Sequence, residues 1–200
     1  LTPMRLSVQN FQRRFSSDDP QCSEKVADFT QMLLQHIDTL SDISDAFSSF
    51  VSMPPQKKER TDLNAIIRHA IAIFDLTYIR FESKQEQICL WVDKNQMNRM
   101  LTNLLKNAIY ATDNIPDPLI EVTTYVTGDF AYIVVKDNGS GVPPELQERI
   151  FEPKFTTKNT AGSGLGLTMV KHIINAHGGT ITLNSEVGKG ATFTVELKIK

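Results

Sequence analysis

Two asparagines spaced four residues apart, Asn103 and Asn107, stand in a stretch with helical periodicity. This spacing places both amides on one face of a helix. Amide oxygens suit a hard, hydrated cation such as Mg²⁺ that is held partly by phosphates. Surface and capping asparagines also occur at this spacing, so the pair alone leaves both interpretations open.

An acidic residue followed by glycines ends a predicted strand. Asp137 comes directly after an apolar run, in the order Asp-Asn-Gly-Ser-Gly. A carboxylate at a strand end can accept a hydrogen bond from an exocyclic amine, and Gly139 and Gly141 allow a ligand to approach the backbone closely. A plain turn is the alternative, because Asp-Asn-Gly is also favourable turn chemistry.

A second glycine-rich stretch leads directly into a predicted helix. Glycine occupies positions 162, 164 and 166, and an apolar helical pattern follows over residues 165–176. Glycines before a helix expose N–H groups, and the helix dipole favours an anion there. No lysine and hydroxyl pair follows the last glycine, so the stretch fits neither the Walker loop nor the usual dinucleotide fingerprint. A glycine-rich loop without a ligand is the alternative.

Residues 151–158, Phe-Glu-Pro-Lys-Phe-Thr-Thr-Lys, precede that loop. Phe151 and Phe155 can anchor a flexible lid to the domain. The hydroxyls and lysines of this segment can reach phosphates. An ordinary mobile loop is the alternative interpretation.

The elements that must position these motifs follow from periodicity. Helices are predicted from Asp62 to about residue 74, with Ile73 on the inner side, and at 94–112 and 165–176. Strands are predicted at 78–82, 88–92, 119–126, 132–136, 180–184 and 192–198. The order is not a regular βαβ alternation. It favours an α+β sandwich, in which helices cover one face of a mixed sheet.

Residues 1–53 are predicted to form a helical hairpin. Within residues 23–51 apolar side chains recur every three or four positions, and His36 fills the vacant position. Such a heptad seam is buried against another helix, so we expect a homodimer with a four-helix bundle. A hairpin packed on its own second domain is the alternative. Residues 54–61 are the expected linker, and residues 62–200 the second domain.

Composition excludes several classes of protein. The chain has 200 residues and a formal net charge of -2, which argues against a broad nucleic-acid-binding surface. No apolar run approaches the roughly 18 residues that cross a bilayer, so any membrane contact is expected through segments outside this sequence. Cys22 and Cys89 lack metal or redox spacing and are expected to be reduced thiols of a cytoplasmic protein.

Taken in order, the motifs resemble the ATP-binding domain shared by sensor histidine kinases, gyrase-type topoisomerases, ninety-kilodalton heat-shock chaperones and mismatch-repair ATPases. Residues 103–108 resemble the asparagine box, 137–141 the first glycine box, 151–155 the phenylalanine box, 162–166 the second glycine box and 188–193 the terminal glycine–threonine block. Within that superfamily, His177-Gly178-Gly179 and the opening Leu1-Thr2-Pro3 are typical of histidine kinases of the nitrogen-regulation type.

The resemblance implies binding of ATP and Mg²⁺. Asn107 would bind the metal, Asn103 would support the phosphates, and Asp137 would recognise the adenine amine. Thr192 would lie near the adenine, and Lys158 would reach the γ-phosphate. Many members have a basic residue at the position of Tyr110, and Lys106 would supply that charge here. The expected ATP-binding residues are Asn103, Lys106, Asn107, Tyr110, Asp137, Gly139, Gly141, Thr156, Thr157, Lys158, Gly162, Ser163, Gly164, Leu165, Gly166, Leu167 and Thr192.

The resemblance also implies the reaction. The related hydrolytic ATPases have a glutamate where this sequence has Asn103, and an amide cannot act as a general base toward water. The γ-phosphoryl group would pass to a histidine and then to the aspartate of a response-regulator receiver domain. In kinases of this type the phosphorylated histidine lies just before Leu-Thr-Pro, which here falls upstream of Leu1, so no catalytic residue is expected within the chain.

Two other functions stay open at this point. One is a serine kinase of the anti-sigma type, which shares the ATP-binding domain but lacks the hairpin. The other is a dimeric scaffold whose nucleotide site is degenerate.

Overall fold

The structure is a computed structural model that describes residues 56–153, 155 and 164–199, and before them positions 8, 11, 25, 26, 29–33 and 37. These early positions are helical. The rings of Phe11 and Phe29 stack with their centroids 3.9 Å apart, so the two halves of the predicted hairpin meet at this point. The rest of the hairpin prediction lies outside the described residues.

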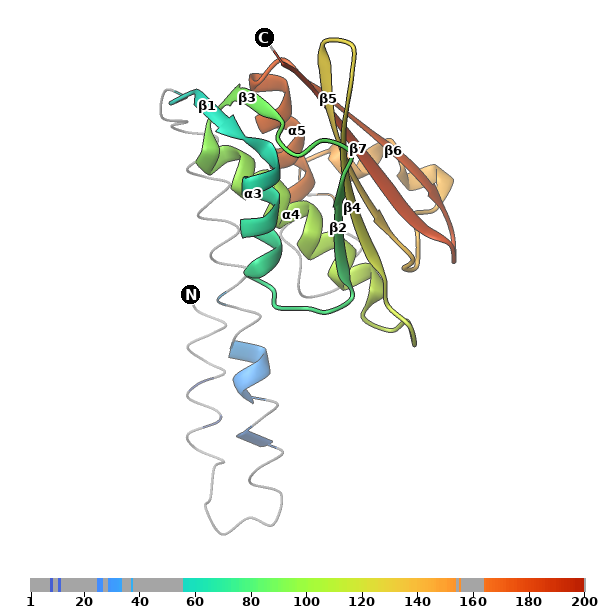
Figure 1. The fold of residues 1–200 in the computed structure, drawn as a ribbon. Helices are drawn as coiled ribbons and strands as arrows, with labels where there is room; N and C mark the ends of the chain where they lie inside the picture. Colours follow the sequence, from blue (N-terminus) through green and yellow to red (C-terminus); the bar gives the residue numbers. More distant parts are fainter. Residues whose placement is uncertain are drawn as a thin grey trace.

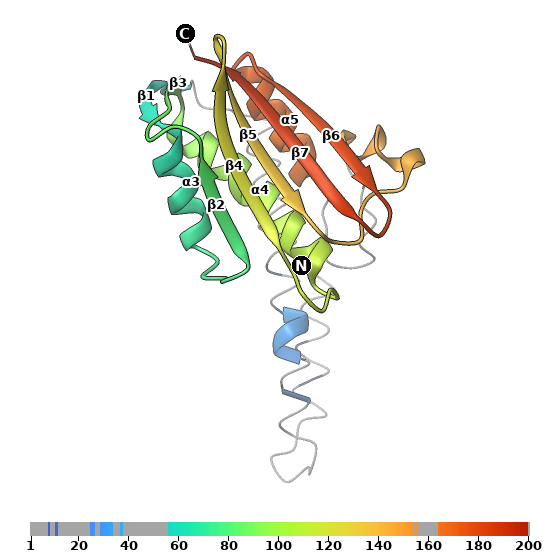
Figure 2. The ribbon, with the colours of Figure 1, turned by 45° about the vertical axis from the view of Figure 1, so that its right-hand side comes forward.

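A five-stranded mixed sheet forms the centre of the described domain (Figures 1 and 2). Its strands are ordered β2-β4-β5-β7-β6, and only β2 and β4 are parallel. The bounds are β2 Ile79–Ser83, β4 Ile120–Thr127, β5 Phe130–Asp137, β6 Thr180–Glu186 and β7 Gly190–Lys198. The predicted α+β fold with a mixed sheet is confirmed.

The helices α3 (Leu63–Ala72), α4 (Lys94–Thr112) and α5 (Gly166–Ala176) cover one face of this sheet (Figure 1). Aspartates fix the starts of two of them, because Asp62 accepts the N–H of Asn64, and Asp93 accepts those of Asn95 and Gln96. The predicted bounds of α4 are confirmed. Among the described helices, none has the length and hydropathy that a membrane span requires.

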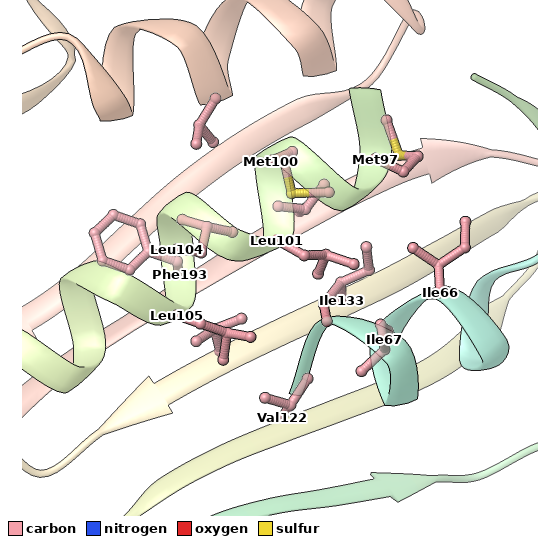
Figure 3. Packing of buried hydrophobic residues seen from close by; sticks show 14 of the residues in the cluster. Ile66, Ile67, Met97, Met100, Leu101, Leu104, Leu105, Val122, Ile133 and Phe193 are labelled. Carbon is pink, nitrogen blue, oxygen red and sulfur yellow. The ribbon is translucent and has the colours of Figure 1, made fainter. Parts of the chain in front are cut away.

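The core lies between α4 and the sheet (Figure 3). The apolar side chains of α4 recur with helical spacing and form one face, and its five most buried hydrophobic residues are each at most 1% exposed: Met97, Met100, Leu101, Leu104 and Leu105. They pack with Ile133, Val122 and Phe193 of the sheet and with Ile66 and Ile67 of α3. This burial fixes the rotation of α4, and with it the direction in which Asn103 and Asn107 point.

Three features differ from the sequence predictions. Part of the predicted linker forms a strand, β1 (Glu59–Asp62), which pairs with β3 (Cys89–Val92) in a separate two-stranded sheet. Its four residues contain no hydrophobic side chain, so no apolar pattern in the sequence predicts this strand. Ile73 caps the end of α3 and is 60% exposed, so its predicted inner position is wrong. Two short 3-10 turns were not predicted: η1 (Pro144–Leu146) lies before the predicted lid, and η2 (Arg149–Phe151) includes the first lid residue.

Candidate nucleotide-binding site

The first asparagine of α4 lies directly against the start of α5. A Cβ atom added to Gly166 would lie 2.9 Å from Oδ1 of Asn103, so the glycine makes room for the amide. The amide is held in place, because its Nδ2 donates to the Arg99 carbonyl oxygen at 2.8 Å and lies 3.9 Å from Sδ of Met169. The asparagine box and the second glycine box therefore meet, as the resemblance implies.

The start of α5 can receive an anion. Its N-cap residue is Leu165, and within the described part of the chain no side chain caps its first N–H groups, unlike those of α3 and α4. The N–H groups of a first helical turn have no partner inside the helix, and the helix dipole makes this end partially positive. Gly164 has φ +67°, a left-handed conformation that glycine adopts without strain just before the helix.

Asp137 is a buried carboxylate at the end of β5 and is only 3% exposed. Its Oδ1 accepts the N–H groups of Gly139 at 2.9 Å and Ala191 at 3.3 Å. Burial raises the pKa of the Asp137 carboxyl, and these two hydrogen bonds only partly oppose that rise. Within the described residues its Oδ2 accepts no hydrogen bond, so that oxygen is available to a ligand donor.

The glycines around Asp137 allow the protein's own backbone to approach. A side chain on Gly139 would collide with the carbonyl oxygen of Ala111 at the end of α4, and one on Gly141 with that of Glu186 in β6. One on Gly190 would collide with the carbonyl oxygen of Asp137 itself. The sequence predicted close approach by a ligand at Gly139 and Gly141. The structure shows that both glycines first allow the loop to fit between α4 and the β6–β7 turn.

The other predicted ATP-binding residues of α4 follow Asn103 along the helix. Asn107 is partly buried and follows Asn103 by one helical turn, whereas Lys106 is exposed and Tyr110 is 50% exposed. Leu165 and Leu167 are partly buried at the start of α5.

The structure does not bring the Thr192 side chain to Asp137. Thr192 alternates along β7 with buried Ala191 and Phe193, and it pairs with the exposed Lys136. Its side chain therefore points to the sheet face that carries no helix. Ala191, which donates its N–H to Asp137, occupies the inner position that the sequence analysis missed. The apolar alternation of Phe193, Val195 and Leu197 is the signal that identifies this face.

The phenylalanine box is tied to the domain at its first residue. The Phe151 ring contacts Phe193 edge-on with 6.4 Å between centroids, and Lys171 Nζ lies 5.4 Å from the Phe151 ring. The Thr168 hydroxyl of α5 also donates to the Phe151 carbonyl oxygen at 3.2 Å. The predicted contacts of Thr156, Thr157, Lys158, Gly162 and Ser163 fall outside the described residues.

His177 supports the start of α4. Its Nε2 accepts the N–H of Asp93 at 3.1 Å, which places the proton on Nδ1, where it is donated to the Ile173 carbonyl oxygen at 2.8 Å. The Asp93 carboxylate also accepts the N–H of Lys57 at 2.9 Å. Burial lowers the pKa of His177, which keeps the ring neutral.

Comparisons with known proteins agree with this geometry. Residues 92–200 match the family described as histidine kinase-, DNA gyrase B-, and HSP90-like ATPases. A putative NtrY-like sensor histidine kinase of Rickettsia conorii is 31% identical over 206 residues, which cover 100% of this chain and 34% of that protein. The nitrogen regulation protein NtrY of Azorhizobium caulinodans is 32% identical over 207 residues, which cover 99% of this chain and 27% of that protein. The chain thus spans about a third of the length of these relatives.

Solved structures show the same architecture. The nucleotide-free catalytic domain of the histidine kinase ThkA aligns with a TM-score of 0.65 and 30% identity, covering 72% of this chain and 97% of that one. ThkA in complex with the response regulator protein TrrA aligns with a TM-score of 0.77 and 25% identity, covering 100% of this chain and 59% of that one. From the match over more than half of its length, and from its sensor-kinase relatives, the chain belongs to the histidine kinase-, DNA gyrase B-, and HSP90-like ATPase family.

Proposed function

We propose that this chain is the kinase core of a two-component sensor histidine kinase, in which residues 62–200 bind ATP. The observation that carries this proposal is the juxtaposition of Asn103 with Gly166, which joins the asparagine box to the start of α5, a helix start that no side chain caps among the described residues. Between them a phosphate group would meet N–H groups from one side and amides from the other.

The adenine would lie at Asp137, near the C-terminal end of α4. Oδ1 of Asp137 is occupied by two backbone N–H groups, and Oδ2 would accept a hydrogen bond from the exocyclic amine. A buried carboxylate with a raised pKa is destabilised until it gains such a donor. The site therefore favours a ligand that brings an N–H group to Asp137.

Mg²⁺ fits the donor set, because Asn107 offers an amide oxygen on the same helical face as Asn103. When bound, the metal supplies charge neutralisation at the phosphates. Lys106 would add positive charge beside α4, and Lys158 would do so from the lid.

Asn103 distinguishes a kinase from a hydrolase. Its amide is fixed by Arg99 and Gly166 and has no basic oxygen that could take a proton from water. ATP would therefore stay intact until a histidine nitrogen attacks the γ-phosphorus. A P–N bond then forms at the unprotonated ring nitrogen, the bond from the γ-phosphorus to the β–γ bridging oxygen breaks, and ADP leaves. The single N–H proton of the imidazole, on the other ring nitrogen, then passes to water.

The assembly and partners are part of the same proposal. Two copies would pair through the helical hairpin, because Val26 of the heptad seam is 38% exposed in the single chain. A receiver domain would accept the phosphoryl group, as the complex of ThkA with a response regulator suggests for that related kinase. The reaction would take place in the cytoplasm.

Transfer in trans tests the proposed reaction. The chain is incubated with Mg²⁺ and ATP labelled at the γ-phosphate, together with the separate histidine-bearing helical domain of an NtrY-type relative. We expect label on that domain that is labile to acid and stable to alkali, as a phosphohistidine is, and at least about 10-fold less label with Asp137→Asn at subsaturating ATP. Release of inorganic phosphate at a rate independent of the acceptor would instead identify a hydrolase, and acid-stable label would identify a serine kinase.

A further inference from the structure

Ser185, near the end of β6, forms hydrogen bonds to two backbone segments near Asp137. The Ser185 hydroxyl oxygen accepts the N–H of Val142 at 2.8 Å, and its proton is donated to the carbonyl oxygen of Gly190 at 2.7 Å. Val142 ends the loop that begins at Asp137. Gly190 directly precedes Ala191, whose N–H holds the Asp137 carboxylate. One hydroxyl therefore joins the loop that follows Asp137 to the segment that donates an N–H group to its carboxylate.

A glutamine binds the same junction, in which the loop after Asp137 meets the end of β6 and the start of β7. Gln147 stands between η1 and η2, which lie beside β6 (Figure 2). Its side-chain Nε2 donates to the carbonyl oxygens of Val142 at 3.0 Å and Ser185 at 2.9 Å. Both amide protons are thus used within the protein, and Gln147 ties the segment that leads to Phe151 to this junction.

The backbone supports this junction only in part. Gly188 donates its N–H to the Ser140 carbonyl oxygen at 2.8 Å. Around it, Gly141 lies against the Glu186 carbonyl group and Gly190 against that of Asp137, and neither glycine has a side chain that could hold these contacts in place. The hydrogen bonds of Ser185 and Gln147 supply the directional contacts that the glycines lack.

We propose that Ser185 and Gln147 are positioning residues of the nucleotide site, which hold the Asp137 carboxylate in the place where it meets the base. This inference rests on the proposed role of Asp137 toward adenine. Neither side chain contacts the nucleotide in this account, because both use their donors within the protein. Their effect passes through Val142, Gly190 and Ala191 to Asp137.

The test compares ATP with purine riboside triphosphate, which lacks the exocyclic amine. Dissociation constants for both, with Mg²⁺, are measured by calorimetry for the wild-type chain, Ser185→Ala, Ser185→Thr and Gln147→Met. The ratio of the two constants reports how well Asp137 meets the amine. A variant that only lowers the folded fraction weakens both ligands equally and leaves the ratio unchanged.

We expect Ser185→Ala and Gln147→Met each to reduce the preference for ATP by about 3- to 10-fold, the effect of misplacing one hydrogen bond. Ser185→Thr keeps the hydroxyl and suits a strand, so it should restore the wild-type ratio. Thr182→Val, which removes an exposed hydroxyl from the same strand, is the matched control and should have the wild-type ratio.

An unchanged ratio in both Ser185→Ala and Gln147→Met, with a lowered melting temperature, would overturn the inference and leave these residues a structural role only. If Ser185→Ala does not fold, Gln147→Met decides alone. A wild-type chain that binds both triphosphates equally would contradict the role of Asp137 itself, and this inference with it. The two failures can be told apart. If only the positioning role fails, the wild-type chain still prefers ATP over purine riboside triphosphate.

Discussion

The Asp137 carboxylate is buried at a position where the folded chain stabilises its negative charge poorly. The residue is 3% exposed, and burial raises the pKa of its carboxyl above the ordinary value of 3.8. The folded chain therefore binds the proton more tightly than the unfolded chain does. The resulting loss of stability is present at neutral pH and disappears as the pH falls through the raised pKa.

We predict that Asp137→Asn raises the free energy of unfolding at pH 7, because asparagine keeps an oxygen for the N–H groups of Gly139 and Ala191 without the charge. Urea unfolding should show this gain shrinking as the pH is lowered toward 4. Asp137→Ala is the contrasting variant and should lose about 1–3 kcal/mol, because both N–H groups lose their partner. A lower stability of Asp137→Asn at pH 7 would contradict this account of the buried charge.

Among single residues, the sequence predicts some members of the candidate site and not others. Each motif alone has an ordinary structural alternative, and the order of the motifs, through the family resemblance, predicts Asp137, Asn103 and the glycines as site residues. The motifs did not identify Ala191, which contributes a backbone N–H that any residue except proline could provide. The resemblance implies Thr192 as a site residue, whereas the strand alternation places its side chain on the sheet face opposite Asp137.

Among the elements, α4 determines the layout of the site. Its apolar spacing predicts its bounds from the sequence, and the structure shows that Asp93 caps its start. The strand β1 and the turns η1 and η2 were missed, because they have little or no apolar periodicity and depend on tertiary partners. Elements with a buried face could therefore be predicted, whereas elements fixed by hydrogen bonds to distant residues could not.

The start of α4 is held by groups from three segments. Asp93 accepts N–H groups from α4 itself and from Lys57, and it donates its own N–H to His177 at the end of α5. Burial alone would raise the pKa of the Asp93 carboxyl, but the N–H groups of Gln96, Lys57 and Asn95 lower it below its ordinary value. His177 must stay neutral to accept from Asp93.

We predict that His177 makes the domain sensitive to mild acid. Burial lowers its pKa in the folded chain, so below the unfolded value of 6.5 only the unfolded chain takes up the proton. The free energy of unfolding should therefore fall as the pH drops below 6.5 and level off under the folded pKa. His177→Gln, which keeps an acceptor for Asp93, should lose about 1 kcal/mol at pH 7.5.

The measurement is the difference in unfolding free energy between wild type and His177→Gln from pH 7.5 to 5. Other titrating groups are common to both proteins and cancel. The wild-type advantage should shrink as the pH falls, and an advantage that stays constant would show that His177 is not the group responsible.

For the whole molecule, the heptad seam predicts assembly through the hairpin and a nucleotide site that is separate from it. Val26 is 38% exposed in the single chain, and all the described site residues follow residue 102. We predict that Val26→Asp converts a dimer into monomers in sedimentation experiments and leaves the affinity for Mg²⁺-ATP unchanged. Gln31→Asp, which adds the same charge off the seam, should remain dimeric. A dimeric Val26→Asp would place the contact between copies elsewhere.

The central claim is that Asp137 and the start of α5 form one ATP site, and calorimetric titration with Mg²⁺-ATP tests it most directly. The wild-type chain should bind one equivalent saturably, and Asp137→Asn should bind at least about 10-fold more weakly, the effect of losing a hydrogen bond to a charged group. Because Asp137→Asn is expected to be the more stable protein, weaker binding would not reflect unfolding. Equal affinity of both proteins, or no binding by either, would contradict the account.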